Sequence, residues 1–504
     1  MNMGMKYVIG IDLGTSAVKA LLVNRRGEVC GEASRSYPLI MEKSGWSEQN
    51  PEDWVEQTAA AIAELVKGLS GDARAIEGLS FSGQMHGLVL LDENNEPVRH
   101  AILWNDTRTT RQCEDIHRTM GGREGLLRIA RNVALEGFTL PKILWVREHE
   151  PEKFARARTF VLPKDYVRFR MTGALHIDYS DAAGTLLLDV ARREWSAELL
   201  ERFGLPADFC PPLAESHELV GTITPAFARL TGLAEGTKVF AGGADNACGA
   251  IGAGILAEGR TMCSIGTSGV VLSYESRGDL DFDGKVHYFN HGAEKAYYTM
   301  GVVLSAGYSL SWFKDAFASR ESFDGLLDGV GDLPPGSGGL LYTPYLVGER
   351  TPHADSAIRG SFIGIDASHE RRHFVRAVME GITFALNESL EIFREHGKKI
   401  DSIVSIGGGA KSDIWLQMQA DIFRTRVEKL ASEQGPGMGA AMLAAYGCGW
   451  FSSLEECAGQ FVRTSQVFEP IEANVSAYER LFSIYRQVYA QTKPLSEQLQ
   501  EFRK

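Results

Sequence analysis

The sequence predicts an α/β protein made of two similar halves, and two glycine-containing turns are the observations that predict it. The apolar run Tyr7 to Ile11 has the composition of a buried strand and stops at Asp12-Leu13-Gly14-Thr15-Ser16. The same Gly-Thr-Ser pattern returns at Ser264 to Gly269, and Val270 to Leu272 continues it as a second apolar run. A motif that occurs once in each half of a chain indicates a duplicated domain.

Both turns have the residues of a site for a metal-bound phosphate. Turn amides and hydroxyls donate to phosphate oxygens, and a carboxylate at a strand end, such as Asp12, holds Mg²⁺ directly or through water. Taken alone, the first turn is equally compatible with an ordinary hairpin whose Asp caps the turn. The second copy favours a nucleotide held between two halves.

Length, charge and cysteine content narrow the class of protein. A chain of 504 residues favours at least two domains. A net charge of −13 without a long basic run argues against nucleic acid or a membrane surface as the main partner. Seven scattered cysteines without a Cys-x-x-Cys pair fit reduced thiols better than disulfides or a zinc site. Since no signal peptide or bilayer-spanning run fits, we expect a cytoplasmic protein.

The next candidate site follows a predicted buried strand from Ala75 to Phe81. That strand leads into Ser82-Gly83-Gln84-Met85-His86-Gly87, whose two glycines indicate a loop that points into a cleft. The alternative is a core methionine beside a histidine with a structural hydrogen bond. Farther on, Leu103 to Arg108 holds an aromatic, an amide, a carboxylate and a guanidinium, which could line a polyol pocket or form a salt-bridged loop.

The second chemical centre is Asp245, which follows the short strand and glycines of Val239 to Gly243. It stands before a run of small residues, Ala250 to Gly254, that predicts a closely packed helix. Asp245 could be the N-cap of that helix, or a carboxylate that accepts a proton from a substrate hydroxyl. The two roles are compatible, because a helix N-terminus favours an ionised carboxylate.

Glycines near the C-terminus suggest where a nucleoside lies. The predicted strand Ile403 to Ile406 opens into Gly407 to Asp413, and a glycine run between strand and helix lets a flat base or ribose lie against backbone. A small-residue helix that begins at Gly435 to Gly439 could form the other wall. The sequence contains no Gly-x₄-Gly-Lys-Ser/Thr loop and no protein-kinase catalytic motif.

The two turns together resemble the actin-like, ribonuclease H-like ATPase fold, and the complete set of motifs resembles the FGGY carbohydrate kinases. The resemblance extends from about Tyr7 to the predicted C-terminal helix. The Ser82 to Gly87 loop is the most discriminating piece, and it is most similar to family members that act on D-xylulose. The other segments that carry the resemblance are Asp12 to Ser16, Pro163 to Tyr166, Asp181 to Thr185, Gly243 to Asn246, Ser264 to Gly269, Tyr345 to Gly364 and Gly407 to Asp413.

The resemblance implies two actin-like domains, a sugar-binding domain at 1–252 and a nucleotide-binding domain at 253–504, with the nucleotide and sugar cleft between them. It implies transfer of the ATP γ-phosphoryl group to the 5-hydroxyl of D-xylulose, with Mg²⁺ as cofactor. Another ketopentose or polyol as substrate remains an alternative, as does a sugar-sensing protein without catalysis. A homodimer is suggested by the resemblance alone.

The resemblance also assigns roles to individual residues, and it leads us to expect that the halves close on the sugar. Asp245 would orient the 5-hydroxyl and accept its proton. The remaining roles are ketose binding by Met85, His86 and Asn246, positioning of Mg²⁺ through water by Asp12, phosphate contacts by Thr15, Gly266 and Thr267, and adenosine contacts by Gly307, Gly409 and Asp413.

Overall fold

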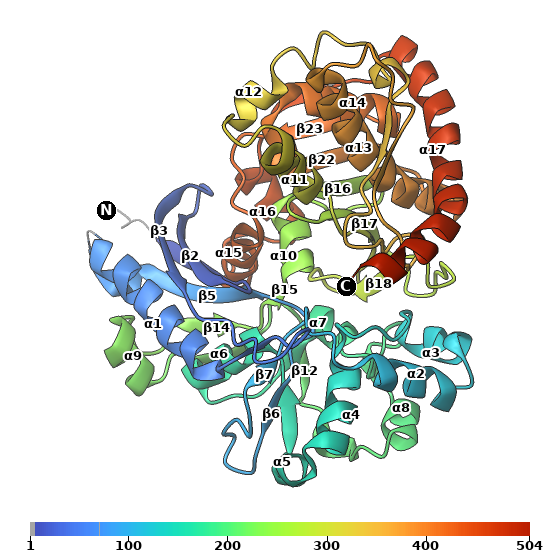
Figure 1. Ribbon diagram of the computed structural model, residues 1–504. Coiled ribbons are helices and arrows are strands. Elements are labelled where there is room, and N and C mark those ends of the chain that lie inside the picture. The colour runs from blue at the N-terminus through green and yellow to red at the C-terminus, as the bar shows by residue number, and fades with distance from the viewer. Residues whose placement is uncertain (1–5, 70, 504) are drawn as a thin grey trace.

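The structure, a computed structural model that describes residues 6–69 and 71–503, has two α/β halves, each built on a seven-stranded sheet (Figure 1). The first sheet has the order β13 (Leu219–Thr222), β14 (Lys238–Phe240), β5 (Ile76–Gly83), β1 (Tyr7–Leu13), β2 (Ala17–Asn24) and β3 (Val29–Ser36), with β15 (Gly243–Ala244) paired to β5. The second has the order β18 (His287–Asn290), β19 (Tyr297–Val303), β17 (Gly269–Glu275), β16 (Arg260–Ile265), β22 (Ser402–Gly407), β23 (Val427–Leu430) and β24 (Thr464–Phe468).

The two sheets share one pattern of strand directions. In the first, β1 pairs antiparallel with β2 and parallel with β5, and β2 pairs antiparallel with β3. In the second, β16 pairs antiparallel with β17 and parallel with β22, and β17 pairs antiparallel with β19. Each Gly-Thr-Ser turn closes the central hairpin of its sheet. The duplicated α/β fold predicted from those turns is therefore confirmed.

Strand β1 is longer than predicted. It continues through Leu13, so Asp12 lies inside the strand, opposite Lys19 on β2 and Ser82 on β5. The hydrogen bonds of both neighbouring strands hold the backbone extended at a position where the sequence suggested a turn. The Asp12 carboxylate is consequently attached to a central strand of the sheet, where the backbone is rigid.

Helices cover both faces of the first sheet (Figure 1). The first of them is α1 (Pro51–Gly68), and the Asn50 side chain caps it by accepting from the Glu52 amide. The other helices of this half are α2 (Thr110–Thr119), α3 (Arg123–Ala130), α4 (Thr139–His149), α5 (Pro151–Arg156), α6 (Pro163–Thr172), α7 (Tyr179–Ala183), α8 (Ala197–Arg202) and α9 (Pro225–Thr231). Four two-stranded ribbons extend it: β4 (Glu48–Gln49) with β7 (Ala101–Ile102), β6 (Val89–Leu91) with β8 (Thr159–Val161), β9 (Ile177–Asp178) with β12 (Leu213–Ala214), and β10 (Leu188–Asp189) with β11 (Glu194–Trp195).

The second half is dominated by longer helices (Figure 1). Among them is α13 (Arg371–Glu395), which is 25 residues long. The others are α11 (Gly307–Phe317), α12 (Phe323–Leu327), α14 (Asp413–Phe423), α16 (Leu454–Phe461) and α17 (Glu472–Leu499), and a ribbon joins β20 (Leu341–Thr343) to β21 (Ser361–Ile363). Among the described residues, no helix combines the length and the apolar character needed to cross a membrane.

Two small-residue helices lie between the sheets, α10 (Asp245–Gly252) and α15 (Pro436–Gly447) (Figure 1). They approach each other and β1 closely because glycines stand at the contacts. A Cβ at Gly10 would lie 2.1 Å from the Gly437 oxygen, and one at Gly439 would lie 1.9 Å from the Cys248 oxygen. Helix α15 therefore packs on the first sheet, which differs from its expected place as a wall of the nucleoside site.

This packing gives a stability prediction for Gly439→Ala. The added methyl meets the Cys248 carbonyl, so the helices must separate, and we expect a loss of about 1–3 kcal/mol in the free energy of unfolding. The control is Gly459→Ala in α16, where a Cβ meets no atom within 4 Å and alanine favours the helix. Urea denaturation followed by circular dichroism measures both variants. Equal stability of the two variants would contradict the tight contact.

Candidate functional site

Asp245 is the first residue of α10 and follows β15 directly. Its Oδ1 accepts from the Asn246 backbone amide at 2.7 Å and from Asn246 Nδ2 at 3.0 Å. The N-cap position belongs to Ala244, so the interpretation of Asp245 as the cap is wrong. Burial, and to a smaller extent the negative charge of Asp12, raise the pKa of Asp245 to about 7. A carboxylate with a pKa near neutrality is suited to general base catalysis.

Asp12 brings a second carboxylate to the same region from the centre of β1. Burial raises its pKa, while the positive charge of Lys19 acts in the opposite direction. The charge of Asp12 reaches Asp245, so the two acids form a like-charged pair contributed by one sheet and the helix that follows it. Carboxylate oxygens are the ligands that Mg²⁺ prefers, and a divalent cation would relieve this repulsion. The donor set therefore fits Mg²⁺.

The loop after β5 places Met85 beside the start of α10. The side chain of Met85 is 4% exposed, and the Asn246 Nδ2 atom lies 3.6 Å from its sulfur. The structure thus brings together three residues predicted for one site, Met85, Asn246 and Asp245, although 160 residues of sequence separate the loop from the helix.

His86 presents one defined ring nitrogen as an acceptor. Its Nδ1 lies 2.8 Å from the Gly184 carbonyl oxygen, which can only accept, so Nδ1 carries the proton. Burial, with the nearby charge of Lys142, lowers the pKa of His86 to about 3, so the ring is neutral. A neutral ring with its proton on Nδ1 leaves Nε2 free to accept from a hydroxyl. The residue has φ 67°, a strained value outside glycine that is common at functional sites.

Atoms from both halves hold His86 in place. Its ring centroid lies 4.6 Å from that of Phe138 and 6.1 Å from that of Phe289 on β18. Its backbone oxygen accepts from Thr139 Oγ1 at 3.0 Å and from Lys142 Nζ at 3.1 Å. The Met-His loop is therefore a fixed part of the site, at a position where the two halves meet.

A cavity of about 660 Å³ lies in the second half and gathers four of the predicted nucleotide residues, Gly266, Thr267, Gly307 and Gly409. The Gly307 amide donates to the Gly266 oxygen at 2.8 Å, which ties the second Gly-Thr-Ser turn to the start of α11. The remaining wall comes from α11, α12 and the start of α14, including Tyr308, Leu310, Ser311, Phe323, Leu327, Ile414 and Trp415.

Asp413 lies at the rim of this cavity. It begins α14 between Ser412 and Ile414, which do line the cavity, but it is not itself among the lining residues. Its carboxylate is 57% exposed and accepts from Lys429 Nζ at 2.7 Å.

The layout is that of a site for two substrates. The first half contributes two acidic residues and one strained histidine, and the second half contributes a glycine-lined cavity. The chain matches both parts of one family: the N-terminal domain of the FGGY family of carbohydrate kinases over residues 7–252 and the C-terminal domain over residues 261–448. The chain belongs to the FGGY family of carbohydrate kinases.

Individual FGGY kinases are closely similar to it. It is 64% identical to the xylulose kinase of Bacillus subtilis over 99% of this chain and 100% of that protein. Its structure superposes with a TM-score of 0.92 on a ligand-bound xylulose kinase from Lactobacillus acidophilus, 28% identical, covering 97% of this chain and 98% of that one. With a "xyloylose kinase" from Brucella ovis the TM-score is 0.90 at 34% identity, covering 97% and 99%.

The first Gly-Thr-Ser turn of this FGGY kinase has partners that were not predicted. Trp104 Nε1 donates to Thr15 Oγ1 at 2.9 Å, and Gln49 Nε2 donates to the Thr15 oxygen at 2.7 Å. For the rest of the Leu103 to Arg108 stretch, the salt-bridged loop is the correct alternative, because Arg108 pairs with buried Asp106 at 2.6 Å. Trp104, 47% exposed, is the part of this stretch that faces the turn.

Sequence reasoning also missed Gly184 and Phe289 as supports of His86. A Cβ at Gly184 would lie 2.7 Å from His86 Nδ1, so a side chain there would displace the ring. Gly184 lies in the motif Asp181 to Thr185, so its importance was visible, but nothing local indicated which side chain it faces. Phe289 lies in an ordinary apolar strand and carried no signal.

Proposed function

We propose that this FGGY kinase transfers the γ-phosphoryl group of ATP to the 5-hydroxyl of D-xylulose and forms D-xylulose 5-phosphate. One observation carries the proposal: Asp245, Asn246 and Met85 lie together, with His86 next to Met85 in the same loop, in a chain that is 64% identical over nearly its whole length to a xylulose kinase. The fold and family alone would leave the sugar open.

Asp245 is proposed as the general base that orients the 5-hydroxyl and accepts its proton. Phosphoryl transfer passes through a loose transition state in which the proton leaves late, so the base needs correct placement more than strength. The pKa of about 7 keeps a large fraction of Asp245 ionised at neutral pH. The side-chain amide of Asn246 donates to the Asp245 carboxylate, so the orientation of this carboxylate is fixed before the substrate binds.

Sugar hydroxyls are proposed to bind at His86 Nε2 and beside Asn246. The neutral ring of His86 accepts a hydrogen bond from a sugar hydroxyl at Nε2. Because the proton is on Nδ1, Nε2 can only accept and cannot donate. Met85 supplies an apolar surface for the carbon chain. A site that requires a donor at one position discriminates strongly against sugars that lack it there.

The phosphates of ATP are proposed to lie between the two Gly-Thr-Ser turns. Thr15 on one side and the amides of Gly266 and Thr267 on the other would donate to phosphate oxygens. Asp12 would hold Mg²⁺ by way of water. When bound, Mg²⁺ neutralises charge that develops on the phosphates. The adenosine is proposed to fill the 660 Å³ cavity beside Gly307 and Gly409, with Asp413 at its rim.

The wider arrangement remains part of the proposal. The sugar would bind to the domain of residues 1–252 and ATP to that of residues 253–504, and the halves would close to keep water from accepting the phosphoryl group. The homodimer suggested by the resemblance and the cytoplasmic location expected from the sequence stay predictions.

The first test is ADP release with Mg-ATP in the presence and absence of D-xylulose. We expect strong stimulation of the wild type by the sugar. Asp245→Asn, which keeps the shape of the side chain and removes the base, is expected to lower kcat by about 10²–10⁴-fold. The affinity for ADP, measured by calorimetry, should be unchanged in the variant, because the proposed ADP cavity lies in the half that does not contain Asp245. Sugar-stimulated turnover at the wild-type rate in Asp245→Asn would contradict the assignment.

A substrate panel separates the choice of sugar from the mechanism. D-xylulose, L-ribulose, D-gluconate and glycerol are compared by kcat/KM with the wild type. We expect D-xylulose to be preferred. Preference for another sugar would keep the kinase mechanism and overturn the substrate. Absence of stimulation by any of them would favour the alternative of a sugar sensor.

The pKa of Asp245 predicts an acid limb in the pH profile. The base must be ionised, so kcat/KM for the sugar at saturating Mg-ATP should be lost as pH falls through the pKa of Asp245, with a midpoint at or below about 7. The midpoint moves down if a cation beside Asp12 offsets the like charge that raises this pKa. His86, with a pKa of about 3, stays neutral between pH 5 and 8 and does not contribute. A flat profile over that range would contradict Asp245 as the base.

Filling the cavity tests the nucleotide site. Ser311 lines it on α11, and its hydroxyl bonds only to carbonyls of its own helix, so Ser311→Phe adds bulk without breaking a contact to another element. We expect its dissociation constant for ADP to rise at least about tenfold. The matched control is Ser483→Phe on α17, an exposed serine that also bonds back to its own helix. Equal ADP affinity of the two variants, measured by calorimetry, would exclude this cavity.

A further inference from the structure

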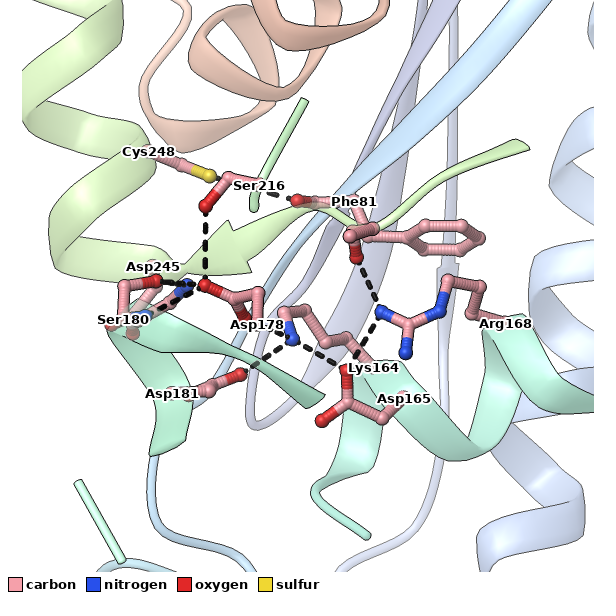
Figure 2. A network of polar contacts seen from close by, with 12 residues as sticks. Phe81, Lys164, Asp165, Arg168, Asp178, Ser180, Asp181, Ser216, Asp245 and Cys248 are labelled. Atoms are coloured by element: carbon pink, nitrogen blue, oxygen red, sulfur yellow. Dashed lines mark hydrogen bonds and ion pairs between the residues drawn. The ribbon is translucent and has the colours of Figure 1, made fainter. Parts of the chain in front are cut away.

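A buried cluster of charges lies next to Asp245 and has no part in the mechanism above. At its centre, Lys164 Nζ lies 2.6 Å from Asp165, 2.7 Å from Asp178 and 2.8 Å from Asp181 (Figure 2). All four side chains are fully buried. Arg168, also fully buried, adds a second cation 2.8 Å from Asp165. Burying so many charges is costly unless each is paired, so the arrangement has to be complete to be tolerated.

The cluster is not a metal site, although its three carboxylates lie close enough together to hold an ion. The ammonium group of Lys164 already lies among them, within ion-pair distance of all three carboxylates. Burial raises the pKa of Asp181. Lys164 and Arg168 pair with the three carboxylates inside this half, so the cluster is self-contained.

Asp178 connects this unit to the catalytic helix. Its Oδ2 accepts from both the amide and the hydroxyl of Ser180 on α7. The Ser180 oxygen in turn accepts from the Ala244 amide at 2.9 Å, and Ala244 immediately precedes Asp245 (Figure 2). An ion pair from Lys164 to Asp178, followed by hydrogen bonds from Asp178 to Ser180 and from Ser180 to the Ala244 amide, therefore connects the cluster to the Gly243–Ala244 peptide, one residue before Asp245.

The cluster also reaches the strand before Asp245 and the sugar loop. Arg168 Nη1 donates to the Ala241 oxygen, which lies at the other end of the segment that leads to α10. The Lys164 side chain packs on Gly83, where a Cβ would lie 2.6 Å from the Lys164 Cβ. Gly83 pairs with Ala244 in the sheet and stands two residues before Met85. The cluster thus contacts both segments that carry the sugar-site residues.

We propose that the Lys164 cluster positions the catalytic base: acting through Asp178 and Ser180, it fixes the Gly243–Ala244 peptide, which ends one residue before Asp245, and with it the direction of the carboxylate. Ser180 is the positioning residue of this device. The inference rests on the proposed function, since it concerns the base of that reaction. It gives a physical reason for the motifs Pro163 to Tyr166 and Asp181 to Thr185, which contribute residues to the cluster. Neither motif is among the residues that line the nucleotide cavity.

A pair of serines allows a matched test. Ser180 and Ser216 are both buried, and both hydroxyls lie within hydrogen-bond distance of Asp178 Oδ2, Ser216 at 3.2 Å. Only the Ser180 oxygen accepts from the Ala244 amide. Ser180→Ala therefore removes the link to Asp245, while Ser216→Ala removes a hydroxyl from the same carboxylate and leaves that link intact.

The experiment measures kcat, the sugar KM and the pH profile of the full chain with D-xylulose and Mg-ATP, well below the unfolding temperature of each variant. We expect Ser180→Ala to lower kcat by about 10–100-fold with a smaller change in KM, because a small displacement of a reacting group is costly. The acid midpoint of kcat/KM should also move, since the carboxylate changes its surroundings. Ser216→Ala should stay within about twofold of the wild type in all three quantities.

The proposal is overturned if Ser180→Ala keeps the wild-type kcat, or if Ser216→Ala loses as much, since the effect would then be a general loosening of the cluster. Should Ser180→Ala fail to fold, Ser180→Cys gives the same comparison, because a thiol fills the space but accepts weakly. Failure of the proposed function is distinct: wild type would not turn over D-xylulose. The serine pair would then be compared with the sugar that the panel identifies, with the same two deciding outcomes.

Discussion

The close approach of β1, α10 and α15 is the constraint on which the rest of the molecule depends. Gly10 and Gly439 let backbone meet backbone, and a side chain at either point would push the elements apart. This contact sets Asp12 on β1 within electrostatic reach of Asp245 on α10. It also joins a helix from the C-terminal part of the sequence to the first sheet. The geometry of the acidic pair is thus a consequence of small-residue packing.

Electrostatics explains why the surroundings of Asp245 are built so differently from the cavity in the second half. A buried carboxylate near another carboxylate tends to take up a proton, and its pKa is raised accordingly. A completely ionised base would require positive neighbours, which would hold the carboxylate back from the sugar. The adjacent cluster instead satisfies its own charges internally and reaches Asp245 only through hydrogen bonds. Position is controlled without adding a countercharge to the base.

The sequence was sufficient for the fold class and the family and for proposing the candidate site residues, because those rest on local patterns. Two Gly-Thr-Ser turns revealed the duplication, and Met85, His86 and Asp245 stood at strand ends or turns. What remained out of reach depends on long-range contacts. Helix α15 has apolar residues on all sides, so no pattern indicated which sheet it covers. The Gly184 carbonyl that fixes the His86 tautomer lies 98 residues away from it.

Rigidity is distributed unevenly between the two halves of the site, and this fits the demands of phosphoryl transfer. The first half contains the strained His86, the Asn246 side-chain amide that binds the Asp245 carboxylate, and the buried Lys164 cluster. The cavity of the second half is lined by glycine backbone and the apolar side chains of α11 and α14. A reaction that depends on alignment needs at least one partner fixed in advance. In the proposed mechanism the acceptor and its base are fixed on the first half, so closure would have only to deliver the phosphate, and the accuracy of the step would be set by Asp245 and the peptide that precedes it.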